Sequence, residues 1–414
     1  MSETGSTESG TDLLEPGDPR YRRMLGAVFL AGFAVFLVMY DTQGLLPQIG
    51  GDLGAGEALT GWTVAATTLG MAGGMIPLSR FGLRWGLFTR MVVFVLLAGV
   101  VGVGVGAMPS IGSLIAVRFV QGLLVAVVPA SALALIAERA TPRAITHATG
   151  IYLAGNTVGG LASRLGPGLL AEVTTWRWAL AAMGALCLVC GLVVILLLRP
   201  SGSTVPAAPP GRGGLSTAIQ DSLATAGVPA ACLAGAALMA CFNSAYTVIG
   251  FRLQAPPLGL GPGPANLVFL LYLLGTFASP RAGGLAARFG TAPVLVTSAV
   301  AVAVGYLIAG SGSLVLVVIG LGLMTGMFFV GHTVASATVG RLSPARSRST
   351  AAALYLTAYY VGATGGSALG TWGFELWGWR APALFALGYA LIAVLAALRI
   401  AAHTRSGRGR LCRG

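Results

Sequence analysis

The sequence predicts an all-α membrane protein with twelve transmembrane helices in two pseudo-symmetric six-helix bundles. The 414 residues have a mean hydropathy of +0.84 and only 9% are charged, which leaves too little polar surface to cover a soluble fold. Apolar stretches of about twenty residues, long enough to cross the hydrocarbon core of a bilayer, recur along the whole chain. The second half of the chain also repeats features of the first half.

The apolar stretches define the expected order of elements. They occupy residues 24–46, 58–78, 87–107, 111–136, 147–169, 178–198, 228–250, 264–281, 291–309, 313–339, 351–373 and 381–398. We therefore expect one bundle over 24–198 and a second over 228–399. Three segments lie outside the bundles. Residues 1–23 form an acidic, disordered cytosolic tail, and residues 400–414 form a basic cytosolic tail. Residues 199–227, rich in Pro, Gly, Ser and Ala, form a cytosolic linker between the bundles.

The first span should remain in the protein as a membrane anchor. Residues 1–23 lack the basic start and the apolar centre of a signal peptide, so no cleavage is expected. If the N-terminus is cytosolic, the cytosolic segments contain 20 of the 25 arginines. Positive charge is retained on the cytosolic side, which predicts that both termini lie there. Although the net charge is +13, these arginines flank membrane spans, so we expect the lipid bilayer as a partner and no nucleic acid.

An internal repeat relates the two halves. The Trp-Arg pair at 176–177 recurs at 379–380, and Tyr152 recurs as Tyr355, both 203 residues later. An Arg-Phe-Gly sequence follows the second span and also the eighth. Parallel repeats of this kind are typical of transporters that bind substrate near the membrane midplane, between the two halves.

Polarity divides the spans into two classes. The third, sixth, ninth and twelfth spans are almost wholly apolar, so we expect them to face lipid. The other eight should surround a polar cavity, because hydrocarbon would reject their polar side chains. These include Asp41, Gln43, Thr67, Thr68, Arg118, Gln121, Asn156, Asn243, His332 and Tyr359.

Asp41 and Arg118 are the candidates for proton coupling, together with Gln121 on the same span as Arg118. Asp41 is the only acidic residue well inside a predicted span, and Arg118 lies at a similar depth on a helix that runs the other way. A carboxyl group beside a movable cation can take up and release protons. The alternatives are a purely structural ion pair or an Asp41 close enough to the interface to remain hydrated.

Candidate substrate-binding side chains lie in five spans, and four of them, Asn156, Asn243, His332 and Tyr359, lie about mid-span. The full set is Tyr40, Gln43, Asn156, Asn243, Tyr246, His332 and Tyr359. Hydrogen-bonded contacts between helices are the competing explanation for the Asn and His residues, and His332 could instead handle protons. Arg164 could recruit an anion or pair with Glu172. The sequence has no nucleotide-binding loop, nucleophile-base pair or metal-ligand cluster, so we expect neither an enzyme nor an ATP-driven pump.

Several motifs resemble the major facilitator superfamily of secondary transporters. Residues 118–122, Arg-Phe-Val-Gln-Gly, resemble its helix-4 signature, which is associated with proton coupling in drug-type antiporters. Residues 283–290 resemble its cytosolic loop motif, and residues 80–84 resemble the copy of that motif in the first half. The resemblance implies that these loops control conformation through Ser79, Arg80, Gly82, Arg84, Gly283, Arg288 and Gly290. Ser79 and Ala287 stand where the superfamily carries aspartate, so the charged part of the cytosolic latch is missing.

The resemblance covers essentially the whole chain and is strongest to the YnfM-like branch of bacterial inner-membrane efflux carriers. It implies a monomeric antiporter in the inner membrane that exchanges protons for a small organic molecule or drug by alternating access. The proton gradient is the driving force, with no cofactor and no metal. A proton symporter or facilitator that imports a metabolite is the first alternative, because this fold serves either direction. A non-transporting membrane sensor is the second.

Overall fold

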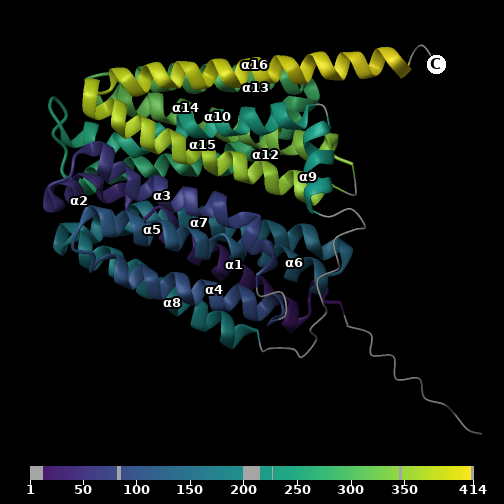
Figure 1. Ribbon diagram of the computed structural model, residues 1–414, viewed down its shortest axis with the longest axis horizontal. Helices are drawn as coiled ribbons and strands as arrows, with labels where there is room; N and C mark the ends of the chain where they lie inside the picture. The colour runs from purple at the N-terminus through teal and green to yellow at the C-terminus, as the bar shows by residue number, and fades with distance from the viewer. Residues whose placement is uncertain (1–12, 82–84, 199–214, 226, 345–346, 412–414) are drawn as a thin grey trace, which may run out of the picture.

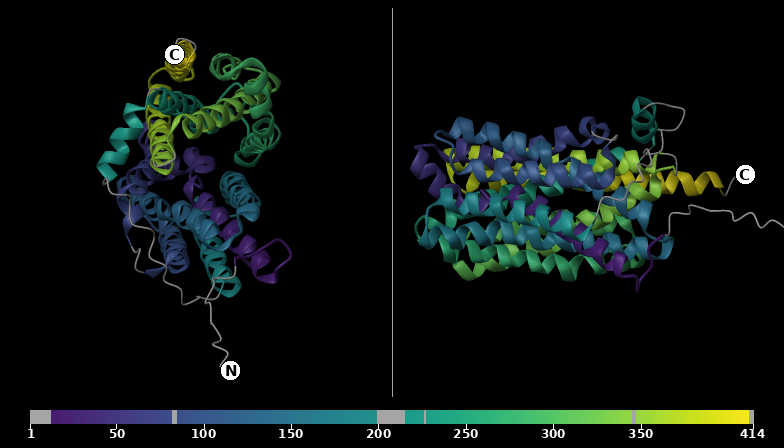
Figure 2. Two further views of the ribbon diagram at one scale, coloured as in Figure 1. Left: turned by 90° about the vertical axis from the view of Figure 1, so that its right-hand side faces the viewer. Right: turned by 90° about the horizontal axis from the view of Figure 1, so that it is seen from below.

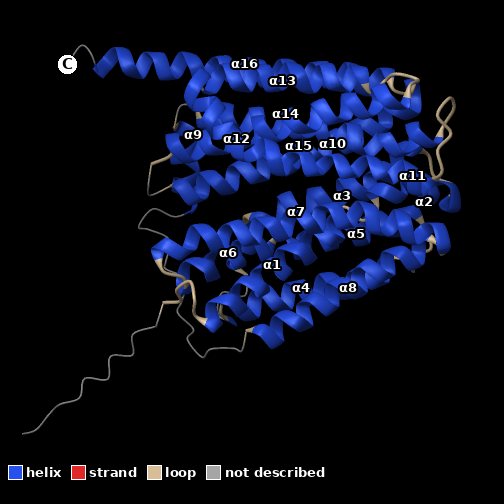
Figure 3. Ribbon diagram, turned by 180° about the vertical axis from the view of Figure 1, so that it is seen from behind, coloured by secondary structure: helices blue, strands red, loops and turns tan. Residues whose placement is uncertain are grey.

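The computed structural model describes residues 13–81, 85–198, 215–225, 227–344 and 347–411. The described chain is almost entirely helical, and its long helices lie side by side (Figures 1 and 3). The first half contains α1 (Pro19–Met39) continued by η1 (Gln43–Leu45) and α2 (Leu46–Leu53), then α3 (Glu57–Met75), η2 (Pro77–Arg80), α4 (Leu87–Val105), α5 (Ile111–Val125) continued by α6 (Val127–Arg139), α7 (Pro142–Val173) and α8 (Trp176–Leu197).

The second half has the same organisation. A short helix, α9 (Leu215–Ala224), precedes it. It then contains α10 (Val228–Gln254), α11 (Pro262–Asn266) continued by η4 (Leu267–Leu273) and α12 (Leu274–Phe289), then α13 (Thr291–Ile308), α14 (Leu314–Leu342), α15 (Arg348–Trp377) and α16 (Arg380–Leu411). Counted with their continuations, these helices form six long segments in each half, as the internal repeat predicts.

Each half forms one bundle. Helices α1 to α8 lie together in the lower part of Figure 1, and α10 to α16 lie above them. The end-on view in Figure 2 separates the same two groups. Helices α4 and α8 lie at the far edge of the first bundle, and α13 and α16, which contain the predicted ninth and twelfth spans, lie at the far edge of the second. These positions are the farthest from the boundary between the bundles.

Nine of the described segments are long and apolar enough to span a membrane by composition alone. Helices α3, α7 and α15 fall outside this group because they are rich in Gly, Thr and other small or polar residues. All three lie at the boundary between the bundles, where α3 packs against α15 and α7 packs against α11. Their lower hydropathy therefore matches a position that is covered by protein.

Small residues bring corresponding helices close together in both bundles. In α7, a Cβ atom at Gly155 or Gly159 would clash with the backbone carbonyls of Phe29 and Phe33 in α1. In α15, a Cβ atom at Gly362 would clash with the Ala236 carbonyl in α10. Close packing of α1 with α7, and of α10 with α15, therefore depends on side chains no larger than hydrogen.

The two ends of the molecule are distinguished by the chain termini. The start of α1, helix α9 and the end of α16 lie at one end, which we call the proximal end (Figure 1). Helix α2 and the turn between α10 and α11 lie at the opposite, distal end.

Three boundaries differ from the expectations. Helix α1 begins at Pro19, inside the predicted disordered tail, because Asp18 caps it by accepting a hydrogen bond from the Arg20 amide at 2.7 Å. Leu14, in the same predicted tail, forms backbone hydrogen bonds with Arg139 and Thr141. Part of the predicted linker forms α9, and α16 continues to Leu411 through most of the predicted C-terminal tail. Residues 1–12, 199–214 and 412–414 lie outside the described part of the chain.

Candidate functional site

A break in the first membrane segment organises the site. Helix α1 ends at Met39, a single 3-10 turn follows from Gln43, and α2 starts at Leu46. Pro47 has no backbone N–H and its ring does not fit a continuous α-helix through the preceding turn. The break leaves the last carbonyls of α1 without helical partners, so other groups must satisfy them inside the protein.

Arg118 of α5 satisfies these carbonyls. Its Nη1 atom donates to the Val38 carbonyl and its Nη2 atom donates to the Met39 carbonyl, each at 2.8 Å. Its Nε atom donates to the Thr63 carbonyl in α3 at 3.3 Å. A cation at the C-terminal end of α1 also interacts favourably with the helix dipole. Arg118 therefore joins three helices at the break.

Asp41 lies in the same break and forms an ion pair with Arg118. The Nη1 atom of Arg118 is 2.7 Å from Oδ1 of Asp41, and both side chains are fully buried. Gln121 accepts a further hydrogen bond from Arg118 and donates to the Ala98 carbonyl of α4 at 3.3 Å. The structure thus brings together all three residues that the sequence nominates for proton coupling.

A second polar group crosses the boundary between the bundles. Arg164 of α7 donates from Nε to Oε1 of Gln43 at 2.7 Å. The amide nitrogen of Gln43 donates to Thr247 at 3.0 Å and to Asn243 at 3.4 Å, both in α10 of the second bundle. Asn243 in turn donates to Ser367 of α15 at 2.6 Å. This network, which we call the distal network, links four elements of both bundles.

Two carboxylates also join the bundles at the distal end. Glu172 accepts from the Gly263 amide at 2.8 Å, and Glu375 accepts from the Ala58 amide at 2.7 Å. Within the described residues Glu172 forms no ion pair with Arg164, which removes that alternative explanation of Arg164. The hydrogen bonds of the distal network and of these carboxylates hold the two bundles together at that end.

An aromatic group lies on the boundary face of the second bundle. The rings of Phe242 and Phe328 stack with centroids 3.9 Å apart, and Tyr272 packs on Phe242 at 5.2 Å. Tyr246, also in contact with Tyr272, bonds through its hydroxyl to Thr325 at 2.7 Å. These rings are contributed by α10, η4 and α14.

His332 extends this group toward the proximal end. Its Nδ1 atom is 2.8 Å from the Tyr355 hydroxyl, and its ring centroid is 4.7 Å from that of Tyr359. Both His332 and Tyr359 are half-buried. Tyr40, by contrast, is buried beside the α1 break, with its ring 4.1 Å from the Arg164 guanidinium.

The remaining candidates lie elsewhere. Asn156 is half-buried in the contact between α7 and α1, where its side chain would clash with a Cβ atom at Gly32. Gly283 and Arg288 lie in α12, and Gly290 is the residue that ends this helix. Ser79 and Arg80 belong to η2, whereas Gly82 and Arg84 fall outside the described residues.

Several residues of the site were not nominated from the sequence. Phe242, Phe269, Tyr272, Phe328, Thr247 and Ser367 all contact nominated residues. The one usable signal was the spacing of Phe269 and Tyr272, three residues apart in an otherwise aliphatic stretch. In the described residues no group of three or more His, Cys, Asp or Glu side chains could hold a metal ion.

A family model described as Major Facilitator Superfamily matches residues 25–261 and 233–410. The chain belongs to the Major Facilitator Superfamily. It is therefore a multi-pass membrane transporter and not an enzyme, and transporters of this superfamily generally need no cofactor. The superfamily assignment also confirms the predicted fold of twelve helices in two bundles.

Individual relatives agree with this assignment. The inner membrane transport protein YnfM of Escherichia coli (strain K12) is 29% identical over 395 residues, which cover 95% of this chain and 94% of that protein. The "Probable multidrug-efflux transporter Rv1634" of Mycobacterium tuberculosis (strain ATCC 25618 / H37Rv) is 28% identical over 303 residues, or 65% of this chain and 60% of that protein. The crystal structure of the nucleoside transporter NupG superposes with a TM-score of 0.72 at 13% identity, covering 92% and 99% of the two chains, and shows the shared fold.

Proposed function

We propose that this superfamily member is a proton-coupled antiporter of the bacterial inner membrane that exports a small organic molecule by alternating access. The observation that carries the proposal is the buried ion pair between Asp41 and Arg118 in the break of α1. Similarity to an inner membrane transport protein and to a protein named for multidrug efflux supports the location and the direction. The arginine distribution supports cytosolic termini.

Protonation of Asp41 lowers the stability of the arrangement in which Arg118 lies in the α1 break. With Asp41 ionised, its negative charge compensates the Arg118 guanidinium where both side chains are fully buried. With Asp41 protonated, Arg118 keeps only its hydrogen bonds to Gln121 and to backbone carbonyls, and removing one partner of a dry pair costs about 3–5 kcal/mol. A cost of that size favours another arrangement of α1 against α3 and α5.

Coupling follows if the two ligands favour opposite states. A proton on Asp41 favours the arrangement in which Arg118 finds new partners, and substrate favours the other arrangement. The distal network must open and close in the same cycle, because it joins the bundles at one end. Gln43, two residues beyond Asp41, belongs to that network, so the proton site and the closure contact lie on the same short segment.

The test compares two modes of transport in proteoliposomes. A compound that stabilises the purified protein in a thermal-shift screen serves as substrate. We expect Asp41→Asn to abolish accumulation driven by a pH gradient, because the carboxyl group carries the proton. Exchange of labelled for unlabelled compound at equal pH should continue, because it needs alternating access without net proton movement. Asp52→Asn is the matched control, since Asp52 is half-exposed at the distal end in a pair with Arg177.

Other outcomes point to other functions. Accumulation by the Asp41→Asn protein under a pH difference alone would refute the assigned proton carrier, and His332→Ala would be measured next. Movement of substrate and protons in the same direction would indicate symport. An absence of exchange by the unmodified protein with every stabilising compound would favour a sensor over a carrier.

A further inference from the structure

Arg164 is a buried cation whose charge is not compensated by the protein that surrounds it. Its side chain lies at the boundary between the bundles and is 3% exposed. Its hydrogen bonds run from Nε to Gln43 and from Nη1 to the Gly160 carbonyl, whereas a guanidinium has five N–H groups. In the part of the chain that the structure describes, no carboxylate forms an ion pair with it. The nearest acidic candidate in sequence, Glu172, binds the Gly263 amide instead.

The contrast with other arginines is direct. Arg118 is equally buried and pairs with Asp41, and the half-exposed Arg177 pairs with Asp52. Burying a charge without an opposite charge is unfavourable, and in a membrane span such a residue marks a functional site. The neutral Gln43 accepts the hydrogen bond from Nε of Arg164. An anion bound from outside the protein would complete the environment of Arg164.

Aromatic rings surround the guanidinium. Its Cζ atom is 4.1 Å from the ring centroid of Tyr40, 4.5 Å from that of Tyr272 and 5.9 Å from that of Phe269. Ring faces attract a cation without neutralising its charge. They therefore hold the guanidinium in place and leave it able to bind an anion.

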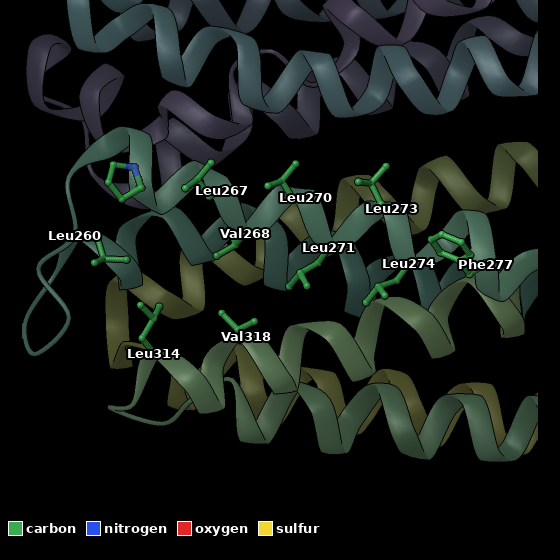
Figure 4. Close-up of a pocket in the computed structure, with 11 residues that line it drawn as sticks. Leu260, Leu267, Val268, Leu270, Leu271, Leu273, Leu274, Phe277, Leu314 and Val318 are labelled. Carbon is green, nitrogen blue, oxygen red and sulfur yellow. The ribbon is translucent and has the colours of Figure 1, made fainter.

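The 3-10 geometry of η4 is what directs two of these rings toward Arg164. A 3-10 helix has three residues per turn, so side chains three apart lie in one row. Figure 4 shows one row formed by Leu267, Leu270 and Leu273 and a second formed by Val268, Leu271 and Leu274. These two rows line an apolar groove of about 430 Å³, and neither Phe269 nor Tyr272 belongs to its lining. The third row contains Asn266, which donates to the Gly44 carbonyl at 3.1 Å, followed by Phe269 and Tyr272.

The rings continue away from Arg164 along the boundary face. Tyr272 contacts Phe242, Phe242 stacks on Phe328, and Phe328 stacks on His332 with centroids 5.9 Å apart. Tyr272 and His332, at the two ends of this row, are half-buried. Phe242 and Phe328 between them are buried, so Tyr272 is the ring of this row that lies beside Arg164 and is partly exposed. A cation beside a partly exposed ring matches a molecule with an acidic group at one end and a flat apolar body.

We propose that Arg164 anchors an anion subsite, and that the transported substrate is an aromatic organic acid. The carboxylate binds the free N–H groups of Arg164 beside Gln43, and the ring lies against the half-buried Tyr272. This inference rests on the proposed transport function for its physiological meaning. A shift between the two arrangements affects a carboxylate and its amide alike, so the preference for the carboxylate does not depend on proton coupling and the two proposals can fail separately.

The experiment measures binding to the purified, full-length protein at one pH. The probes are benzoate, 2-naphthoate and 4-phenylbenzoate, each compared with its neutral amide of the same shape. We expect at least one carboxylate to bind roughly tenfold or more tightly than its amide, because a charge-assisted hydrogen bond is lost in the amide. In Arg164→Gln this preference should disappear, and in Arg164→Lys part of it should remain because the charge remains.

Two further variants make the result specific. Arg252→Gln is the matched control, because Arg252 is another arginine of a membrane helix, in the last turn of α10, but donates to the Gly310 and Ser311 carbonyls. It should keep the full preference for carboxylate. Asp41→Asn should keep it as well, even if pH-driven transport is lost, which separates the two proposals. The inference is refuted if no carboxylate binds more tightly than its amide, or if the folded Arg164→Gln protein retains the preference.

Discussion

Gln43 of the first bundle donates a hydrogen bond to Thr247 of the second bundle at 3.0 Å, and both side chains are buried. The same Gln43 accepts from Arg164 at 2.7 Å. A neutral amide thus connects the candidate anion subsite to the contact between the bundles. Any ligand that changes the position of Arg164 can act on this contact through Gln43.

The first prediction concerns this contact. Thr247→Val removes the acceptor and should shift the protein toward a distally open state by about 1 kcal/mol, roughly fivefold in population. Modification of a single cysteine introduced at Gln48, beside the network in α2, would report the opening. Gln43→Leu should have a similar effect, and the double variant should fall short of the sum because both changes break the same bond. Thr157→Val, which removes an exposed hydroxyl bonded only within α7, is the control.

The second prediction concerns the energy of the α1 break. Arg118→Ala leaves Asp41 and the carbonyls of Val38 and Met39 without their donor, so it should lower stability by about 3–5 kcal/mol. Thermal unfolding of the purified protein would measure the loss. Arg20→Ala removes a pair in which the arginine is 62% exposed and should change stability by no more than about 1 kcal/mol. Equal losses for the two variants would contradict a dry pair at Asp41.

The third prediction concerns the close packing of α7 on α1. Gly155→Ala places a methyl group against the Phe29 carbonyl, and the backbone cannot move aside without separating the helices. We expect a loss of about 1–3 kcal/mol, seen as a lower unfolding temperature. Gly150 lies on the same helix and has no atom within 4 Å of its Cβ position. Gly150→Ala should therefore be neutral or stabilising by up to about 1 kcal/mol.

The fourth prediction concerns orientation in the membrane. The arginine distribution predicts that the proximal end faces the cytosol. A reporter enzyme that works only outside the cytosol should be inactive when fused after Gly414. It should be active when inserted before Gly259, which lies in the turn between α10 and α11 at the opposite end (Figure 1). The reverse pattern of activity would show that the protein has the opposite orientation.

Much of the architecture was predictable because it depends on local properties of the chain. Hydropathy over about twenty residues locates a membrane span wherever the span packs, since lipid imposes the same requirement everywhere. The repeat of Tyr152 as Tyr355, at the same offset as the Trp-Arg pair, indicated two related bundles, because it too can be read along the chain without knowledge of the packing. The depths of Asp41 and Arg118 also followed from counting along helices, which have a constant rise.

The exact helix boundaries were less predictable. Hydropathy alone does not show that Asp18 caps α1, because a cap depends on the backbone conformation of one residue. The first span was expected to be continuous from 24 to 46, whereas α1 ends at Met39. Pro47 is the local cause of the break, but Arg118, far away in sequence, supplies the hydrogen bonds that stabilise it.

The sequence by itself therefore determined that this protein is a helical membrane protein with two related halves and a few polar residues held inside. Only the tertiary structure decided which of those residues meet. The sequence allowed Arg164 either to pair with Glu172 or to bind an anion. In the structure Glu172 accepts from the Gly263 amide of α11, whereas Gln43 of η1 and Tyr272 of η4 lie at the Arg164 guanidinium. The physical reason is that hydrophobicity acts on each segment separately, whereas hydrogen bonds and ion pairs require distances that only the packing of segments far apart in sequence can set.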